Sequence, residues 1–314
     1  MNLGLGTAAL GRPQYINVRQ NDVDNSDLAA FRKQSFQVLE DAYNAGIRYF
    51  DTAPGYGLAE ELVLDWLETK DDNSIEIATK WGYTYTANFD ANATVHEVKE
   101  HSLAKLNEQW NFSKQLLPYL KVYQIHSATL ETGVLENQEV LKQLAFLKKE
   151  YNLKIGLTTT GTNQVEVIKK ALDVFVDGKQ LFDIFQVTYN FLEQSLLEII
   201  DELHQQNKKI VIKEALANGR VFSNKSYTHY QEMYASLEKL SKKHKVGIDA
   251  IALKYCEQTI PKSTVLSGAS NANQLKENLK INSFSLSADD VNLLNSFKTD
   301  AEHYWSERKN LEWN

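Results

Sequence analysis

Four polar side chains with complementary proton chemistry stand at or just after the ends of three successive short apolar runs. They are Asp51, Tyr56, Lys80 and His126. A phenol holds its proton at neutral pH and can donate it, and a neighbouring ammonium lowers the phenol pKa and makes it a stronger acid. A carboxylate would compensate the ammonium charge, and a histidine could polarise a carbonyl oxygen. Together the four groups would stabilise negative charge developing on that oxygen.

Each of these residues also has a structural interpretation. A lone aspartate after a strand usually caps a helix, a lone lysine is usually solvated, a lone histidine is more often structural, and a tyrosine in a glycine-containing loop commonly packs. The occurrence of all four on successive strands and their loops favours a catalytic site. Two of them, Lys80 and Asp51, carry charges that would be costly to bury unless they are paired. None of the four is a hydride source, so a redox reaction here would need a cofactor.

Short apolar runs that alternate with longer amphipathic segments predict a parallel sheet. The predicted strands are 48–53, 75–80, 122–126, 154–159, 184–189 and 209–214, with a weaker run at 263–267 and a poor one at 281–284. The predicted helices are 31–45, 95–110, 140–151, 164–175, 192–206, 230–243, 248–256 and 288–297, the last opened by a capping box of Ser287 and Asp290.

A count near eight strands favours a (β/α)8 barrel over a doubly wound sheet. The N-terminal segment Leu3–Leu10 is expected to add an extra strand, in a strand pair that caps the barrel bottom. In a parallel barrel the carboxyl ends of the strands share one rim, where chemistry is placed. Asp51, Lys80 and His126 would meet there, although they lie far apart in sequence.

Composition excludes several classes of protein. The chain has 314 residues, 43% of them hydrophobic and 24% charged, which is typical of a globular protein and not of a disordered one. The net charge of −7 disfavours nucleic acid as a partner. We expect a single domain over 1–314, a monomer, no membrane span, a cytoplasmic location and a packed core thiol at Cys256.

At this point the sequence resembles the aldo-keto reductase family. The resemblance rests on the segment 46–57 with Glu60 after it, on 78–80 and on 124–126. It implies a (β/α)8 barrel that interconverts carbonyls and alcohols with a nicotinamide cofactor. The tetrad of the family carries over onto the same four residues. Tyr56 would be the acid in reduction and the base in oxidation, Lys80 paired with Asp51 would tune it, and His126 would orient the substrate carbonyl.

The resemblance also implies a set of cofactor-binding residues. They are Gly6, Thr7, Asp51, Thr158, Gln186, Glu214, Leu216, Ala217, Gly219, Arg220, Gly268, Ser270, Gln274 and Asn278. Glu214 could bond a ribose hydroxyl, and Arg220 could pair with the pyrophosphate. Ser270 stands where the family commonly has an arginine that grips the 2′-phosphate, and its loss weakens discrimination for NADP(H). The family pattern still favours NADP(H), with NAD(H) as the alternative.

The substrate pocket is expected to be walled by Trp81 and Tyr83, with no metal ion. The aromatic C-terminal segments 303–306 and 311–314 could fold over its mouth. We therefore expect an NAD(P)(H)-dependent oxidoreductase for a small carbonyl compound or alcohol. Two alternatives stay open: an NAD-dependent aldose or polyol dehydrogenase that works oxidatively, and a non-catalytic subunit that senses nicotinamide.

Overall fold

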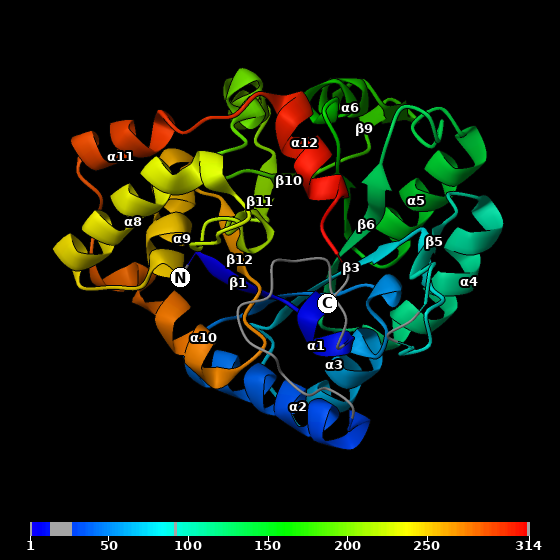
Figure 1. The fold of residues 1–314 in the computed structure, drawn as a ribbon. Helices are drawn as coiled ribbons and strands as arrows, with labels where there is room; N and C mark the ends of the chain where they lie inside the picture. Colours follow the sequence, from blue (N-terminus) through cyan, green and yellow to red (C-terminus); the bar gives the residue numbers. More distant parts are fainter. Residues whose placement is uncertain (1, 13–26, 91–92, 313–314) are drawn as a thin grey trace.

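Eight parallel strands close into a barrel in the computed structural model, which describes residues 2–12, 27–90 and 93–312 (Figure 1). In order around the barrel they are β1 (Leu3–Gly6), β12 (Thr264–Ser267), β11 (Lys209–Lys213), β10 (Ile184–Thr188), β7 (Lys154–Thr159), β6 (Leu120–Ala128), β3 (Glu76–Trp81) and β2 (Tyr49–Asp51). These strands are rich in β-branched and apolar residues because both of their faces are covered. The predicted (β/α)8 fold is confirmed.

Helices surround the barrel and shield the outer faces of its strands (Figure 1). They are α1 (Ala8–Gly11), α2 (Leu28–Asn44), α3 (Ala59–Leu67), α4 (Leu103–Ser113), α5 (Gln138–Glu150), α6 (Gln164–Leu172), α7 (Ile200–Gln205), α8 (Gln231–His244), α9 (Ile248–Thr259), α10 (Ala272–Asn278), α11 (Ala288–Asn295) and α12 (Ala301–Lys309). The predicted capping box of α11 is confirmed, because Ser287 and Asp290 exchange side-chain-to-backbone hydrogen bonds.

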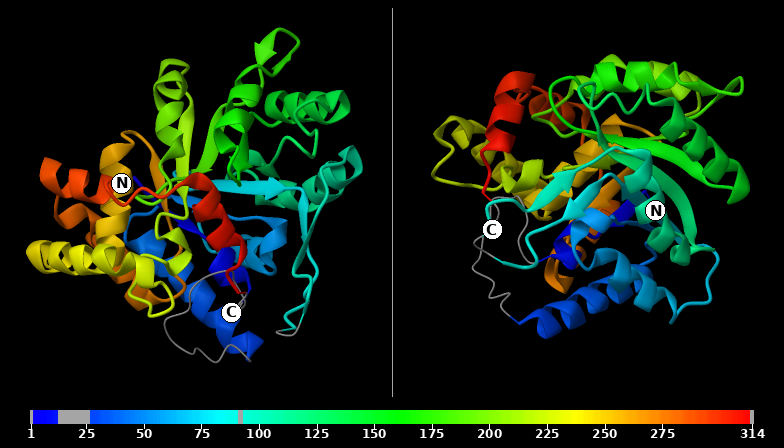
Figure 2. Two further views of the ribbon diagram at one scale, coloured as in Figure 1. Left: turned by 45° about the horizontal axis from the view of Figure 1, so that its top comes forward. Right: turned by 90° about the vertical axis from the view of Figure 1, so that its right-hand side faces the viewer.

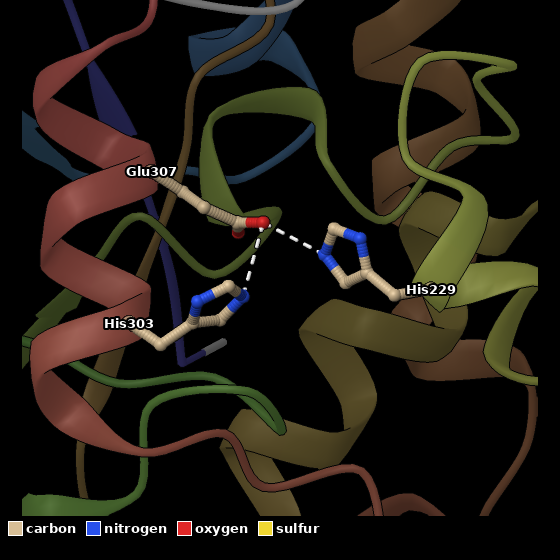
Figure 3. A group of neighbouring side chains, drawn as sticks. All are labelled: His229, His303 and Glu307. Carbon is tan, nitrogen blue, oxygen red and sulfur yellow. Dashed lines mark hydrogen bonds and ion pairs between the residues drawn. The ribbon is translucent and has the colours of Figure 1, made fainter.

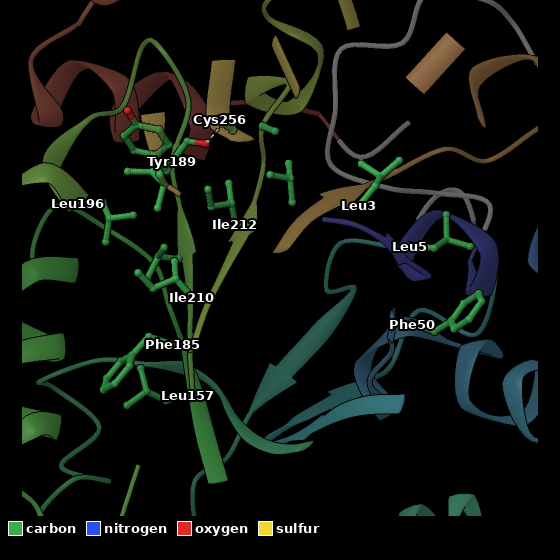
Figure 4. Close-up of a cluster of buried hydrophobic side chains, with 14 of the residues drawn as sticks. Leu3, Leu5, Phe50, Leu157, Phe185, Tyr189, Leu196, Ile210, Ile212 and Cys256 are labelled. Atoms are coloured by element: carbon green, nitrogen blue, oxygen red, sulfur yellow. Dashed lines mark hydrogen bonds between the residues drawn. The ribbon is translucent and has the colours of Figure 1, made fainter. Parts of the chain in front are cut away.

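Alternating side chains divide the strands between two apolar layers. Outward residues such as Leu157, Phe185 and Ile210 pack against the helices in one large buried cluster (Figure 4). Cys256 belongs to this cluster, and its thiol donates to the backbone oxygen of Tyr189 at 3.3 Å, as expected for a core thiol. A second, smaller cluster fills the barrel interior: Tyr49, Ala78, Val122, Ile184, Val211 and Leu266.

The N-terminal segment differs from the expectation. Leu3–Gly6 is a barrel strand that pairs in parallel with β12 and β2, so it does not form a strand pair that caps the barrel bottom. Most of the poor eighth run at 281–284 lies instead in the 3-10 helix η6 (Leu279–Ser283), and Phe284 follows that helix. The physical reason is pairing: a barrel without β1 would leave β12 and β2 with open edges.

Two further segments position the site and were not predicted as they stand. The expected helix at 95–110 begins instead with β5 (Glu97–Lys99), which pairs antiparallel with β4 (Tyr83–Tyr85) in a hairpin that stands out from the barrel wall (Figure 2). At the other end of the chain, α12 packs its buried Tyr304 and Trp305 onto the loop after β10. Residues 313–314 of the expected C-terminal cap lie outside the described residues.

The remaining short elements lie in the connections. They are the antiparallel pair β8 (Phe175–Val176) and β9 (Lys179–Gln180), and the 3-10 helices η1 (Pro54–Tyr56), η2 (Lys114–Leu116), η3 (Ser195–Glu198), η4 (Ala217–Gly219) and η5 (Thr228–Tyr230). The 3-10 helix η3 and α7 together replace the single helix expected at 192–206. Among the described residues, no helix is long and apolar enough to cross a lipid bilayer.

Gly11 allows α1 to lie against the turn that carries Tyr56. A Cβ atom at Gly11 would come within 1.9 Å of the backbone oxygen of Tyr56 and 2.5 Å of the Cβ of Ala59. We therefore expect Gly11→Ala to lower the free energy of unfolding by about 2 kcal/mol or more, measured by urea denaturation. The control is Gly6→Ala, whose Cβ would meet nothing closer than 3.6 Å. Equal stability of the two variants would contradict the close approach.

Candidate active site

A layer of polar side chains lies directly above the smaller apolar cluster that fills the barrel interior, which we call the apolar plug. On five strands, the residue two positions after the plug residue is polar, and the period of two in a strand turns both residues to the same face. We call these residues the polar layer: Asp51, Lys80, Gln124, Gln186 and Lys213. Because all five strands are parallel, the polar layer lies at the carboxyl end of the barrel.

A buried ion pair joins Lys80 and Asp51 at the centre of the polar layer. The Lys80 Nζ lies 2.5 Å from Asp51 Oδ2 and 2.9 Å from the backbone oxygen of Thr52. Their side chains are 0% and 3% exposed. Gln186 Nε2 donates to Asp51 Oδ1 at 2.7 Å, and Gln124 Nε2 lies 3.4 Å from the same oxygen. The pair is thus desolvated but well compensated, which is the condition for keeping two charges in a barrel core.

Tyr56 lies beside this pair on η1. The Lys80 Nζ is 4.6 Å from the centre of the Tyr56 ring, and the guanidinium of Arg12 is 5.6 Å from it. Burial and the Asp51 carboxylate raise the pKa of Tyr56 well above its ordinary value. The net shift in this pKa is opposite in direction to the lowering expected from Lys80, because burial and the Asp51 carboxylate dominate it. Tyr56 holds its proton throughout the physiological range.

His126 completes the group of predicted catalytic residues. Its ring lies edge-on to Tyr56, with 5.5 Å between ring centres, and 4.7 Å from the ring of Tyr83. Burial, together with the charges of Lys80 and Arg12, lowers the pKa of His126 well below its ordinary value, so the imidazole is neutral. A neutral imidazole can donate one hydrogen bond to a carbonyl oxygen without adding a charge.

A cavity of about 850 Å³ begins at the polar layer and extends between β12, α10 and the loop after β11. This volume suits a large organic ligand. Of the predicted site residues, the cavity is lined by Gly6, Asp51, Tyr56, Gln186, Glu214, Leu216, Gly219, Gly268, Ser270, Gln274 and Asn278. These residues come from five separate segments of the sequence and converge on one cavity, with Tyr56 at one end and Ser270 at the other.

Several predicted cofactor residues do not line this cavity. Thr7 donates its hydroxyl to the backbone oxygen of Asp51, and Thr158 accepts from the backbone of Ser127. Ala217 is buried in the core. Arg220 was expected to pair with a pyrophosphate, and the structure differs from this expectation. Arg220 is fully buried, and its guanidinium bonds the backbone of Ala217 and Tyr304 and the side chain of Glu307.

The two predicted substrate-pocket residues have different surroundings. Tyr83 is half-buried against His126, and burial raises its pKa to about 12. Trp81 is fully buried, with its ring 5.5 Å from that of His101, and neither Trp81 nor Tyr83 lines the cavity. A role in contacting substrate is thus better supported for Tyr83 than for Trp81.

Two cations near the predicted site were not singled out from the sequence. Arg12 is 3% exposed and donates to the backbone oxygen of Gly55 and to Glu97. Lys213 lines the cavity and donates to Thr188, and its burial lowers its pKa to about 8. The signal for Lys213 was present, because it is the last residue but one of the strand predicted at 209–214. Arg12 gave no such signal.

Glu60 is a buried carboxyl group that contacts Thr79, the neighbour of Lys80 on β3, and it makes the free energy of unfolding depend on pH. It is 3% exposed, accepts hydrogen bonds from Thr79 and Ser113, and burial raises its pKa to about 7. Between pH 4.5 and 7 the unfolded chain ionises this carboxyl group, whereas the folded chain keeps it protonated. The contribution of Glu60 to stability is therefore full below pH 4.5 and is lost as the pH rises through about 7, by about 3 kcal/mol.

We expect Glu60→Gln to remove this loss, since glutamine stays neutral. Urea denaturation at pH 4.5 and pH 8 measures the difference in free energy of unfolding between the variant and the wild type. That difference should shift by about 3 kcal/mol in favour of the variant at the higher pH. A difference that stays constant across this range would show that folding does not raise the pKa of Glu60.

Comparison with known proteins agrees with the geometry. The model of the Aldo/keto reductase family matches residues 2–299. The chain is 22% identical over 320 residues to the NADH-specific methylglyoxal reductase of Escherichia coli, covering 93% of each chain. It is 23% identical over 294 residues to the uncharacterised oxidoreductase YqkF of Bacillus subtilis, covering 86% of this chain and 89% of that protein.

Solved structures show the same fold. The aldo-keto reductase AKR11C1 from Bacillus halodurans superposes with a TM-score of 0.70 at 21% identity, covering 95% of this chain and 92% of that one. The glycerol dehydrogenase AKR11B4 from Gluconobacter oxydans superposes with a TM-score of 0.72 at 18% identity, covering 94% and 90%. With a family model that spans nearly the whole sequence and a barrel of the same architecture, the chain belongs to the aldo/keto reductase family.

Proposed function

We propose that the protein is an NAD(H)-dependent oxidoreductase that interconverts a small carbonyl compound and the corresponding alcohol, with Tyr56 as the proton donor and acceptor. One observation carries the proposal: Tyr56 lies beside the buried Lys80–Asp51 pair at one end of the large cavity. We further propose that the enzyme is a cytoplasmic monomer of one domain, as the sequence leads us to expect.

The residues that line the cavity fit a nicotinamide cofactor. Glu214 Oε2 is buried and has no hydrogen-bond partner among the described residues, so it is available to a ribose hydroxyl. Gly268 has no atom within 4 Å of a hypothetical Cβ, which leaves open space beside its backbone for a ligand. Gln186 and Asp51 would hold the nicotinamide end, and Ser270, Gln274 and Asn278 the adenosine end. When bound, the cofactor supplies or accepts the hydride.

The chain's own residues would manage the proton and the developing charge. In reduction, the Tyr56 hydroxyl donates its proton to the substrate oxygen as that oxygen becomes an alkoxide, which is a much stronger base than a phenolate. Lys80 stabilises the phenolate that remains, and Asp51 fixes the position of the ammonium. His126, neutral and half-buried beside Tyr56, orients the carbonyl oxygen by a hydrogen bond. In oxidation, Tyr56 takes the proton back.

The far end of the cavity favours NAD(H), whereas the sequence resemblance favours NADP(H). Ser270 and Gln274 bond to each other there, and the carboxylates of Asp249 and Glu277 also line the cavity. Lys213, at the opposite end, is the one lysine or arginine among the described lining residues. Lys262 and Lys276, which could have replaced the missing arginine, are exposed and do not line the cavity. A 2′-phosphate would therefore lie near the carboxylates of Asp249 and Glu277, of which Glu277 is paired with Lys280, and no lysine or arginine of the described residues lines this end of the cavity.

Replacing Tyr56 with phenylalanine tests the proton-transfer role. The Tyr56→Phe variant removes one oxygen and keeps the ring, so we expect kcat with a panel of aldehydes and sugars to fall by about 10²–10⁴-fold in both directions. The affinity for NADH, measured by quenching of tryptophan fluorescence, should change less than threefold. Turnover close to wild type on a substrate accepted by the wild-type enzyme would refute the assignment.

Titration with the two reduced cofactors tests the preference for NAD(H). We expect the wild type to bind NADH at least tenfold more tightly than NADPH. In Ser270→Arg, a new charge-assisted pair should tighten NADPH binding by about 10–100-fold and leave NADH binding nearly unchanged. A wild type that binds NADPH more tightly would overturn the preference for NAD(H) without affecting the role of Tyr56. The matched control, Lys276→Met, should change neither affinity.

A further inference from the structure

Two imidazoles and one carboxylate converge where η5 meets α12 (Figure 3). His229 Nε2 lies 2.7 Å from Glu307 Oε1, and His303 Nε2 lies 3.3 Å from the same oxygen. The three atoms all lie within 4.8 Å of one another. His303 and Glu307 are four residues apart on α12 and so share one face of that helix, whereas His229 comes from a segment more than 70 residues earlier.

The Glu307 carboxylate is held in place by hydrogen bonds to the oxygen that faces away from the two histidines. Its second oxygen, Oε2, accepts a hydrogen bond from the Tyr230 hydroxyl at 2.6 Å and another from the fully buried Arg220 at 3.2 Å. These contacts fix the orientation of Glu307 and direct Oε1 toward the two histidines. Hydrogen bonds of this kind behind a carboxylate are typical of metal ligands.

We propose that His229, His303 and Glu307 bind one divalent transition-metal ion of the zinc type, with water at the remaining position. Zinc ligand atoms lie about 2.0–2.2 Å from the ion, so they stand about 3.3 Å apart in a tetrahedral site. The contact between His303 and Glu307 already has this separation, and His229 must withdraw by about half an ångström. Both histidines are about half exposed, at 46% and 51%, so the ion and its water have access.

The chemistry of the ligands selects the kind of ion. Imidazole nitrogens with one carboxylate suit Zn²⁺, Ni²⁺ or Cu²⁺, whereas Mg²⁺ and Ca²⁺ prefer a set made only of oxygen ligands. The site is separate from the polar layer and the proposal does not depend on the reaction. It touches the cavity only indirectly, because Arg308, next to Glu307 on α12, donates to Glu214 at 2.9 Å.

A bound ion would fasten α12 to the loop after β11. Without it, α12 is held there by hydrogen bonds and ion pairs of Tyr304, Glu307 and Arg308. An ion that binds the folded chain alone stabilises it in proportion to the logarithm of its concentration. At a hundredfold excess over the dissociation constant, the unfolding temperature should rise by about 4 °C.

The test uses the full chain, stripped with a chelator and then dialysed. Co²⁺ is titrated while its visible absorption is followed, and Zn²⁺ is titrated by calorimetry. We expect one ion per chain with a micromolar or lower dissociation constant, and no binding of Mg²⁺. In His229→Gln and His303→Gln the affinity should fall at least tenfold, and the zinc-dependent rise in unfolding temperature should disappear. Both substitutions lie at exposed positions, so folding is preserved.

The matched control is His204→Gln on α7, since His204 belongs to no such cluster among the described residues. It should bind Co²⁺ and Zn²⁺ as the wild type does. Three results would overturn the proposal: a wild type that binds no more tightly than His303→Gln, an equal loss in the control, or binding with no change in unfolding temperature. The first two would mean adventitious binding by surface histidines.

Discussion

The buried contact between Lys80 and Asp51 constrains the rest of the site. Two opposite charges in a barrel core are tolerated only while both remain compensated, and removing one partner from such a pair typically costs about 3–5 kcal/mol. Asp51 meets this condition by accepting from Gln186 as well as from Lys80, and Lys80 by donating also to the backbone of Thr52. The positions of three strands are therefore linked through a few polar atoms.

The barrel explains why these charges can be buried at all. An apolar plug closes the lower part of the interior, and the next inward position on five strands is polar. Strand pairing sets the heights of these positions, because Asp51 pairs with Ala78, and Lys80 with Gln124, in the parallel register. Tyr56 then needs only the short turn η1 to lie beside the pair. Gly11 permits the close approach of α1 that supports this turn.

Much of this arrangement could be predicted from the sequence. The strands that carry Asp51, Lys80 and His126 are short and apolar, so their type and their shared rim followed from pattern alone. The role of β1 did not, because two glycines in four residues make a weak strand signal and only its partners β12 and β2 stabilise it. The hairpin of β4 and β5 was missed because each of its strands has only three residues, and the second falls within the helix expected at 95–110.

The less predictable part of the site concerns charges whose surroundings are set by distant segments. Arg220 looked like a cofactor ligand by its position in a loop, yet α12 buries it against Tyr304 and Glu307. The net effect on the Tyr56 pKa depends on burial and on Asp51, neither of which can be evaluated from spacing. The proposed preference for NAD(H) likewise rests on Asp249 and Glu277, which reach the cavity from α9 and α10.

The central claim is that the Lys80–Asp51 pair acts on the proton transfer of Tyr56 and not on cofactor binding. Single-turnover hydride transfer in Lys80→Met tests it most directly, with NADH and its deuterated form followed in a stopped-flow instrument. The account predicts a rate at least 10²-fold lower than in the wild type, a clear deuterium isotope effect, and an NADH affinity within threefold of the wild-type value. A wild-type rate of hydride transfer in this variant, with NADH bound normally, would contradict the account.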